Sequence, residues 1–344
     1  MKRLKYASVD ITYDCNFRCL HCFNSSGEHK TKNTYLNEEK IIEVVSDLSN
    51  LEPDSICLCG GETMLRKTSI YKILDAKKEG KIKNSVNINC VSNGFLIDEE
   101  TAKTLADKKI NFVQISVDGA TAQTHDWLRN TPGSFDKAIN AIQLLVKNNI
   151  QVGVAFTPTK LNIDELANAI DLVFSLGVFQ FRMQPTMNLG RARKNLNEFF
   201  LDNNDYLKIR YILDKQYKKY LPLKGALIEW GDPLDHLHLG NIMNVNMSIG
   251  AYGDIIPSPY MPLSVGNVKE HRLSEYINNG ILNIWSNPFI NTVATKLNDF
   301  MHMDTKELGL PEIFLEENII LDILDENYEN KTKSLLKQYF NIEL

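Results

Sequence analysis

The sequence predicts an α/β protein: a partial (β/α)6 TIM-type barrel followed by a smaller α+β C-terminal annex. Two observations support this prediction. Apolar runs rich in β-branched residues alternate with amphipathic stretches through the first half of the chain, which is typical of βα units around a parallel sheet. After Gly190 the composition changes, and from Leu221 the chain becomes rich in Pro and Gly, which favours short strands and turns.

The expected elements follow one another at a regular interval. Strands are expected at residues 6–13, 55–59, 86–92, 111–117, 151–157 and 178–184, and helices at 37–50, 68–79, 98–108, 134–147, 163–175 and 203–220. Asn162 and Ser134 are expected to cap two of these helices. A closed barrel needs eight units and only six are counted, so the barrel is open or its remainder is built differently. We expect a barrel domain over 1–215 and an annex over 216–344.

Composition narrows the possible functions. The 344 residues are 43% hydrophobic and 24% charged, as in ordinary globular proteins, and the net charge of −5 argues against a nucleic-acid partner. No signal peptide is recognisable, and no apolar run approaches the length of a membrane span. We therefore expect a cytoplasmic protein without a membrane partner. Six cysteines in a reducing compartment are more typical of metal ligands, reactive thiols or buried small residues than of disulfides.

Three of the cysteines form a compact motif directly after the first expected strand. Cys15, Cys19 and Cys22 are separated by three and then two residues, and three thiolates can hold one face of a cubane iron–sulfur cluster. A structural zinc ion requires four protein ligands, and no fourth cysteine lies nearby. His21 is a conceivable fourth ligand, but as the neighbour of Cys22 it is expected to point away. One iron would then have no protein ligand, at the end of the barrel where active sites assemble.

The spacing Cys-x3-Cys-x2-Cys, with the aromatic residue His21 before the last cysteine, strongly resembles the signature of the radical S-adenosylmethionine (SAM) superfamily. The resemblance implies an enzyme with two cofactors, one [4Fe–4S] cluster held by Cys15, Cys19 and Cys22, and SAM, with His21 among the cofactor-binding residues. In that family the open iron binds the methionine moiety, and one electron releases a 5′-deoxyadenosyl radical that abstracts hydrogen from a C–H bond. The alternative is a zinc or redox-labile thiol site.

Further motifs follow the other expected strands. Gly60-Gly61-Glu62-Thr63 resembles the superfamily's GGEP motif, with Thr63 in place of Pro, and this implies that Gly60, Gly61 and Glu62 bind the methionine amino group. By the same resemblance Ser116 binds the ribose and Arg129 the methionine carboxylate, a task that suits the guanidinium fork. A surface position is the alternative for Arg129. The segment Gly190-Arg191-Ala192 is similar to one that contributes to the adenosine pocket in the same subgroup.

The annex resembles a SPASM domain over residues 253–276, an extension of radical enzymes that mostly modify peptides and proteins. Its usual form binds auxiliary iron–sulfur clusters through cysteines. Here Ser258 stands where the first cysteine is expected, and no cysteine follows Cys90. A serine hydroxyl is a poor iron ligand, so the annex is expected to act as a cluster-free lid or substrate platform.

Two groups of residues are further candidates. Asp232, Asp235 and His236 lie in a loop that suits acid–base chemistry or a second metal, with a capped turn as the alternative. Cys59 shares one face of the second strand with Cys57 and is a candidate hydrogen donor, although burial for packing alone is favoured.

The expected function is radical C–H modification of a ribosomally made peptide, by cross-linking or epimerisation, with flavodoxin or ferredoxin as reductant. Because fourteen residues precede Cys15, any leader peptide is expected to be recognised by the annex or a partner protein. The first alternative is an enzyme acting on a small molecule or cofactor precursor. The second is a non-catalytic iron–sulfur sensor or scaffold.

Overall fold

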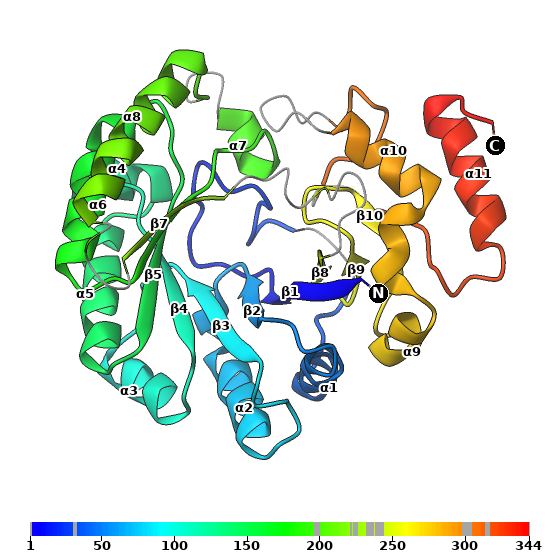
Figure 1. Cartoon of the computed structure of the whole chain (residues 1–344), viewed down its shortest axis with the longest axis horizontal. Helices are drawn as coiled ribbons and strands as arrows, with labels where there is room; N and C mark the ends of the chain where they lie inside the picture. The colour runs from blue at the N-terminus through cyan, green and yellow to red at the C-terminus, as the bar shows by residue number, and fades with distance from the viewer. Residues whose placement is uncertain are drawn as a thin grey trace.

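An open, curved sheet organises the molecule. The computed structural model describes residues 2–29, 33–195, 200–220, 222, 226–231, 237, 244–297, 305–313 and 317–343. Nine strands form the main sheet in the order β7-β6-β5-β4-β3-β2-β1-β8-β9, and all neighbours are parallel except β8 and β9. The two ends of this order, β7 and β9, do not pair in the described part of the chain, so the barrel is open (Figure 1).

The elements have the following bounds. The strands are β1 Arg3–Thr12, β2 Ser55–Gly60, β3 Asn87–Ser92, β4 Phe112–Ser116, β5 Gln151–Phe156, β6 Gln180–Met183, β7 Leu227–Trp230, β8 Asn244–Ile249, β9 Ile255–Ile256, β10 Leu263–Ser264 and β11 Ile319–Ile320. The α-helices are α1 Glu38–Ser49, α2 Lys67–Lys78, α3 Glu99–Asp107, α4 Ala122–Arg129, α5 Ser134–Lys147, α6 Leu166–Ser175, α7 Gly190–Asn195, α8 Asn203–Tyr220, α9 Leu273–Asn278, α10 Pro288–Lys296 and α11 Tyr328–Phe340. The 3₁₀ helices are η1 Thr63–Arg66, η2 Ile163–Glu165 and η4 Ile281–Ser286.

The α/β class and the partial barrel are confirmed, and the six expected strands are β1 to β6. The structure adds two parallel strands. β7 pairs with β6, and β8 pairs with β1 at the opposite end of the sheet. Both follow residue 216, so the sheet draws on the annex side of the expected domain boundary. The division into 1–215 and 216–344 stays a prediction.

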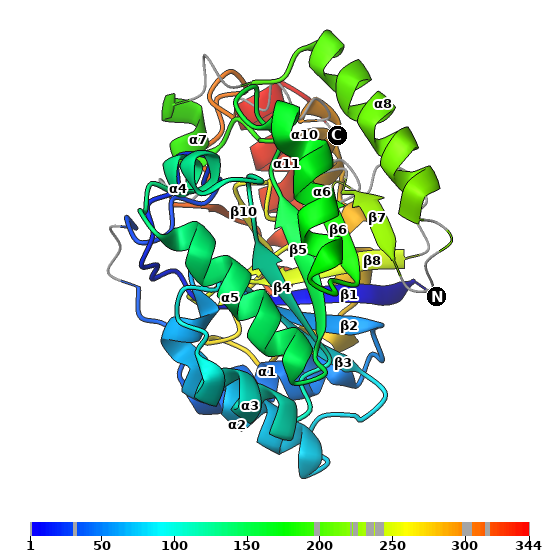
Figure 2. The ribbon, with the colours of Figure 1, turned by 90° about the vertical axis from the view of Figure 1, so that its left-hand side faces the viewer.

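Alternation along each strand separates a helix-covered face from a polar inner face. In β1 and β2 the side chains of Val9, Ile11, Ile56 and Leu58 are fully or almost fully buried in the hydrophobic core. The residues between them are only half-buried. Figure 2 shows α5 and α6 lying over the outer face of the sheet. Because successive side chains point to opposite faces of a strand, the polar residues of β1 and β2 face the inside of the barrel.

Local hydrogen bonds stabilise the first turns of the helices, and two of the capping residues differ from those that the sequence predicted. The expected cap of α5, Ser134, is its first helical residue, and Asp126 accepts hydrogen bonds from the N–H groups of Gly133 and Phe135, at 2.6 and 2.8 Å. Asn162 does not cap its helix with its side chain; its amide instead bonds the preceding loop. Both expected side-chain caps were therefore wrong.

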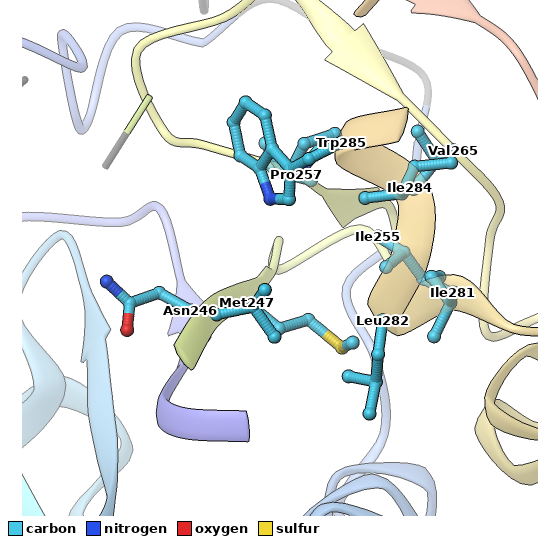
Figure 3. A pocket seen from close by; sticks show the side chains of 11 residues that line it. Asn246, Met247, Ile255, Pro257, Val265, Ile281, Leu282, Ile284 and Trp285 are labelled. Atoms are coloured by element: carbon cyan, nitrogen blue, oxygen red, sulfur yellow. The ribbon is translucent and has the colours of Figure 1, made fainter. Parts of the chain in front are cut away.

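The annex packs around the β8–β9 end of the sheet, on the side opposite α5 and α6 (Figure 1). Ser258 is fully buried there, and its hydroxyl oxygen accepts the N–H of Tyr260 at 3.3 Å, which is the bonding of a tight turn. An apolar cavity of about 10 Å³ lies between β8, β9 and η4, lined by residues that include Met247, Ile255 and Trp285 (Figure 3). This volume has room for about one water molecule, so the cavity is a small gap in the packing between these elements and not a substrate site. Within the described residues, no helix is both long and apolar enough to cross a bilayer.

Candidate active site

The loop after β1 carries the cysteine triplet. Cys19 is buried, whereas Cys15 and Cys22 are half-buried. Burial raises the pKa of the Cys19 thiol to about 12, with Arg129 lowering it in part and the nearby thiols of Cys22 and Cys15 contributing to the rise. In the described residues no three Cys, His, Asp or Glu side chains converge on one point as the ligands of a single metal ion do. Ligands of a cubane bind different iron atoms and need not converge in this way.

Arg191, the second residue of α7, holds this loop in place. Its side chain is buried, and its Nε donates to the carbonyl of Cys19 and its Nη1 to the carbonyl of Ser26, both at 3.0 Å. Its backbone N–H donates to the carbonyl of Cys22 at 2.9 Å. A Cβ on Gly190 would lie 2.3 Å from the carbonyl oxygen of Phe23, so only glycine allows α7 to approach so closely. The contacts of the Gly190–Ala192 segment are thus with the cysteine loop.

The end of β2 also packs against the cysteine loop. A Cβ on Gly60 would lie 2.1 Å from the carbonyl oxygen of Thr12, and one on Gly61 would lie 2.1 Å from that of Asp14. The backbone N–H groups of Gly61 and Glu62 donate to these same two carbonyls, at 2.8 Å each. The two glycines therefore bring the end of β2 against the backbone that leads into Cys15.

Glu62 is almost completely buried next to this contact. Its Oε1 accepts hydrogen bonds from the Ser92 hydroxyl at 2.7 Å and the Met64 N–H at 2.9 Å, and its Oε2 accepts the Asn93 N–H at 2.7 Å. Burial raises the pKa of the Glu62 carboxyl, and these hydrogen bonds lower it by less. The hydroxyl of Thr63 donates to the carbonyl of Val91 at 2.7 Å, which ties β2 to β3 where the resemblance places a proline.

A buried carboxylate at the end of β4 joins two further site residues. Asp118 is completely buried, and its Oδ2 lies 2.7 Å from Arg129 Nη2 and 3.2 Å from His21 Nε2. Burial alone raises the pKa of Asp118, but the charge of Arg129, together with the contact with His21, outweighs it and holds the pKa well below its ordinary value. Arg129 Nη1 also lies 3.9 Å from Cys19 Sγ. Arg129 is therefore not a surface residue; it lies beside the cysteine triplet.

Two neighbours complete this cluster. His125 accepts the N–H of Asp118 at 3.1 Å through Nδ1, and burial together with the charge of Arg129 lowers the pKa of His125 to about 4. Ser116, two residues before Asp118, is half-buried on the inner face of β4, opposite Ala155 of β5. The structure thus brings His21, Ser116 and Arg129 to the end of the barrel that carries the cysteine loop.

The inner face of the barrel carries several polar groups that could meet a substrate. Cys59 Sγ lies 3.4 Å from Cys57 Sγ, and Asp10 of β1 stands opposite Cys59 in the sheet. Cys90, by contrast, is fully buried in the hydrophobic core and serves packing. Arg182 of β6 is half-buried on the inner face and forms no ion pair with any described residue. The inner face therefore offers thiols, a carboxyl group and a guanidinium to a bound molecule.

Comparisons with known proteins identify the barrel. The Radical SAM superfamily model matches residues 9–173, which include all three cysteines of the triplet and Glu62, Ser116 and Arg129. Residues 9–173 therefore form a radical SAM domain. Enzymes of this family use a [4Fe–4S] cluster and SAM, as the sequence analysis expected.

Three curated relatives share this radical SAM barrel. The sporulation killing factor maturation protein SkfB of Bacillus subtilis (strain 168) is 30% identical over 66% of this chain and 51% of its own length. The Fe-coproporphyrin III synthase of Methanosarcina barkeri is 28% identical over 55% of this chain and 46% of its own. The mycofactocin maturase MftC of Mycobacterium tuberculosis is 26% identical over 81% and 69%. The chain thus spans about half the length of the first two.

Solved structures extend the likeness of fold into the annex. Streptococcus suis SuiB bound to its precursor peptide SuiA has a TM-score of 0.63 at 15% identity, over 89% of this chain and 69% of SuiB. Native anSMEcpe with bound AdoMet and Cp18Cys peptide has a TM-score of 0.64 at 18% identity, over 97% of this chain and 96% of that one. At these identities the likeness shows the fold alone.

The residues of this radical SAM site fit its two cofactors. None of the six cysteines is in a disulfide, so the triplet is available for iron. His21 Nδ1 and Arg129 Nε are among the buried polar atoms that lack a hydrogen-bond partner within the part of the chain that the structure describes. Since buried polar groups are nearly always paired, these two atoms suit a bound ligand.

The other candidates stand as follows. Asp232, Asp235 and His236 lie outside the described residues, and their roles stay predictions. The sequence did not predict the contacts of Asp118 with Arg129 and His21. It also did not predict that Arg191 holds the cysteine loop in place. Asp118 was detectable as a charged residue directly after an apolar strand, a position where barrel enzymes often place functional groups.

Proposed function

We propose that this chain reductively cleaves SAM at a [4Fe–4S] cluster held by Cys15, Cys19 and Cys22 and uses the product for C–H modification of a peptide. The observation that carries the proposal is the grouping of three close thiols with Arg129 at the end of a radical SAM barrel. Cluster and cofactor together supply, when bound, a 5′-deoxyadenosyl radical that abstracts hydrogen from an unactivated carbon.

The chain's own residues would hold and orient the cofactor. Gly60, Gly61 and Glu62 would face the methionine amino group, because the buried Glu62 is an acceptor fixed by three hydrogen bonds. Ser116 would bind the ribose through its hydroxyl. Arg129 would offer Nε to the methionine carboxylate, since its Nη2 is taken by Asp118.

A peptide substrate is supported by the relatives and by the shape of the molecule. SkfB and MftC are named as maturation proteins, and the structurally similar SuiB has been solved with a precursor peptide. Among the described residues β7 and β9 do not pair, and an extended substrate would enter the barrel between them. The cluster-free annex would then form one wall of the entrance as a lid or platform.

A small-molecule or cofactor-precursor substrate is the second candidate. The match to an Fe-coproporphyrin III synthase favours it. Arg182, which forms no ion pair with a described residue, lies on the inner face and suits a carboxylate on either kind of substrate. The reductant is proposed to be flavodoxin or ferredoxin, because the chemistry requires one electron at a time. A cytoplasmic location is proposed from the use of free cysteines.

The first experiment tests SAM cleavage. The protein is reconstituted with iron and sulfide without oxygen, then given dithionite and SAM, and 5′-deoxyadenosine is measured by chromatography with mass detection. We expect product above the protein-free control, and expect none from the Cys19→Ala variant. A wild-type yield no greater than the control would refute the proposed cleavage and favour a sensor or scaffold.

The second experiment identifies the substrate class. Short peptides encoded beside this gene are incubated with the active enzyme, and their mass and fragmentation are compared before and after reaction. A loss of two mass units indicates a cross-link. An unchanged mass with altered stereochemistry indicates epimerisation. If no such peptide reacts while a carboxylate-bearing cofactor precursor from the same gene neighbourhood does, the peptide proposal fails and the second candidate takes its place.

A further inference from the structure

Asp118 is a fully buried carboxylate that touches two residues of the proposed cofactor site. Its two oxygens have different partners. Oδ1 accepts the backbone N–H of Thr157 at 2.8 Å, just beyond the end of β5, which anchors the carboxylate to the sheet. Oδ2 faces Arg129 Nη2 at 2.7 Å and His21 Nε2 at 3.2 Å. One oxygen is thus structural, and the other is directed at the cofactor site.

We propose that Asp118 is a positioning residue for SAM, which holds Arg129 and His21 so that Arg129 Nε and His21 Nδ1 face the bound cofactor. Within the described residues, these two atoms of Arg129 and His21 are buried and have no hydrogen-bond partner. The inference rests on the proposed function, since it assigns a role within that same cofactor site.

The contact with Asp118 also selects the hydrogen-bonding character of His21. A neutral imidazole has one N–H donor and one acceptor nitrogen, and the partner of one nitrogen decides the role of the other. His21 Nε2 lies 3.2 Å from Asp118 Oδ2, and this carboxylate favours a proton on Nε2, so that Nδ1 of the neutral ring is the acceptor. An acceptor at this position suits an amino or hydroxyl group of SAM, such as the adenine amino group or a ribose hydroxyl.

Arg129 is oriented in a similar way. Its guanidinium is held at Nη2 by the carboxylate and lies at Nη1 beside the thiol of Cys19. With both ends fixed, Nε has little freedom to turn away from the site. Asp118 therefore acts through its neighbours, and outer partners of this kind typically change affinity by about 10- to 100-fold when they are removed.

The test compares Asp118→Asn with the wild type after iron loading. The substitution preserves shape and removes the charge that holds Arg129 and His21. We expect the SAM dissociation constant and the KM for SAM to rise about 10- to 100-fold, while iron per chain is unchanged. The change in the electron paramagnetic resonance spectrum on adding SAM should need correspondingly more SAM.

Asp126→Asn is a matched control. Asp126 lies on α4 like Arg129 and accepts hydrogen bonds at the start of α5, but it contacts neither His21 nor Arg129 in the described residues. This variant should lose stability and keep the wild-type affinity for SAM. A purely structural role for Asp118 would give the same pattern in both variants, and that result would overturn the proposal.

A second variant keeps the test decisive if Asp118→Asn does not fold. His21→Ala removes one of the two held groups and leaves the Asp118–Arg129 ion pair intact. We expect weaker SAM binding in His21→Ala. Where Asp118→Asn folds, the double variant Asp118→Asn/His21→Ala should lose less than the sum of the two losses, because both changes remove the same contact. Wild-type affinity in His21→Ala would also overturn the proposal. If the wild-type protein makes no 5′-deoxyadenosine, the proposed function fails; if it does and these affinities are unchanged, only this inference fails.

Discussion

Replacing Arg191 by methionine should loosen the cysteine loop. The change keeps most of the side-chain volume but removes the donors that bond the carbonyls of Cys19 and Ser26 at 3.0 Å. A buried acceptor left without a partner costs about 1–3 kcal/mol, so two such acceptors should lower the free energy of unfolding by about 2–6 kcal/mol. The ion pair of Arg191 with Glu28, at 3.1 Å, adds little because Glu28 is 40% exposed. A domain is stable by only about 5–15 kcal/mol. The variant should therefore fold, but with a clearly lower free energy of unfolding than the wild type.

The loss of unfolding free energy is measured by urea unfolding of the cofactor-free protein, with circular dichroism as the signal. Arg3→Met is the control, because the Arg3 side chain is 54% exposed and its ion pair with Asp54 should contribute less than about 1 kcal/mol. Iron per chain is then measured after reconstitution, and we expect a lower value for Arg191→Met alone. Equal unfolding free energies and equal iron in both variants would refute the assigned role of Arg191.

Three further predictions follow from the geometry. Gly61→Ala should lower both the melting temperature and the iron content, because the new Cβ would lie 2.1 Å from the Asp14 carbonyl oxygen; a variant with normal iron would contradict this close contact. Asp10→Asn should be more stable than the wild type at pH 8 but not at pH 4. Burial raises the pKa of Asp10 from 3.8 to about 7, so the folded wild type loses stability as pH rises between these values, by at most about 4 kcal/mol. A pH-independent difference in urea unfolding would exclude this cause. Arg182→Gln should slow modification of the substrate while 5′-deoxyadenosine formation without substrate stays normal; a loss of that basal reaction would place Arg182 elsewhere.

The barrel was predictable because its signal is local. In β1 to β6 buried and half-buried residues alternate, and this period is visible in the sequence. β7 and β8 were missed because they lie in a Gly- and Pro-rich region. Each is defined by pairing with a strand distant in sequence: β7 with β6, and β8 with β1. The short helix α4 was also missed, although Thr121 accepts the N–H of Thr124 as a typical N-cap.

The candidate site was predictable where its residues form motifs with a fixed spacing in the sequence. The cysteine triplet and the Gly-Gly-Glu motif have fixed separations along the chain, so both could be recognised without a structure. The partners of Arg191 and Asp118 could not be, because each depends on loops far apart in sequence that only the fold brings together. The close approach at Gly61 shows the same limit: the motif indicated that Gly61 takes part in binding the methionine amino group, but not that the backbone of Asp14 is its neighbour.

Iron and acid-labile sulfide counting tests the central claim most directly. The account predicts about four iron atoms per chain in the reconstituted wild type, as for one cubane cluster. It predicts essentially none in a variant with Cys15, Cys19 and Cys22 changed to alanine. A matched variant with Cys57, Cys59 and Cys90 changed to serine should keep the wild-type value wherever it folds. Iron retained without the triplet, or about eight atoms in the wild type, would contradict a single cluster on this loop.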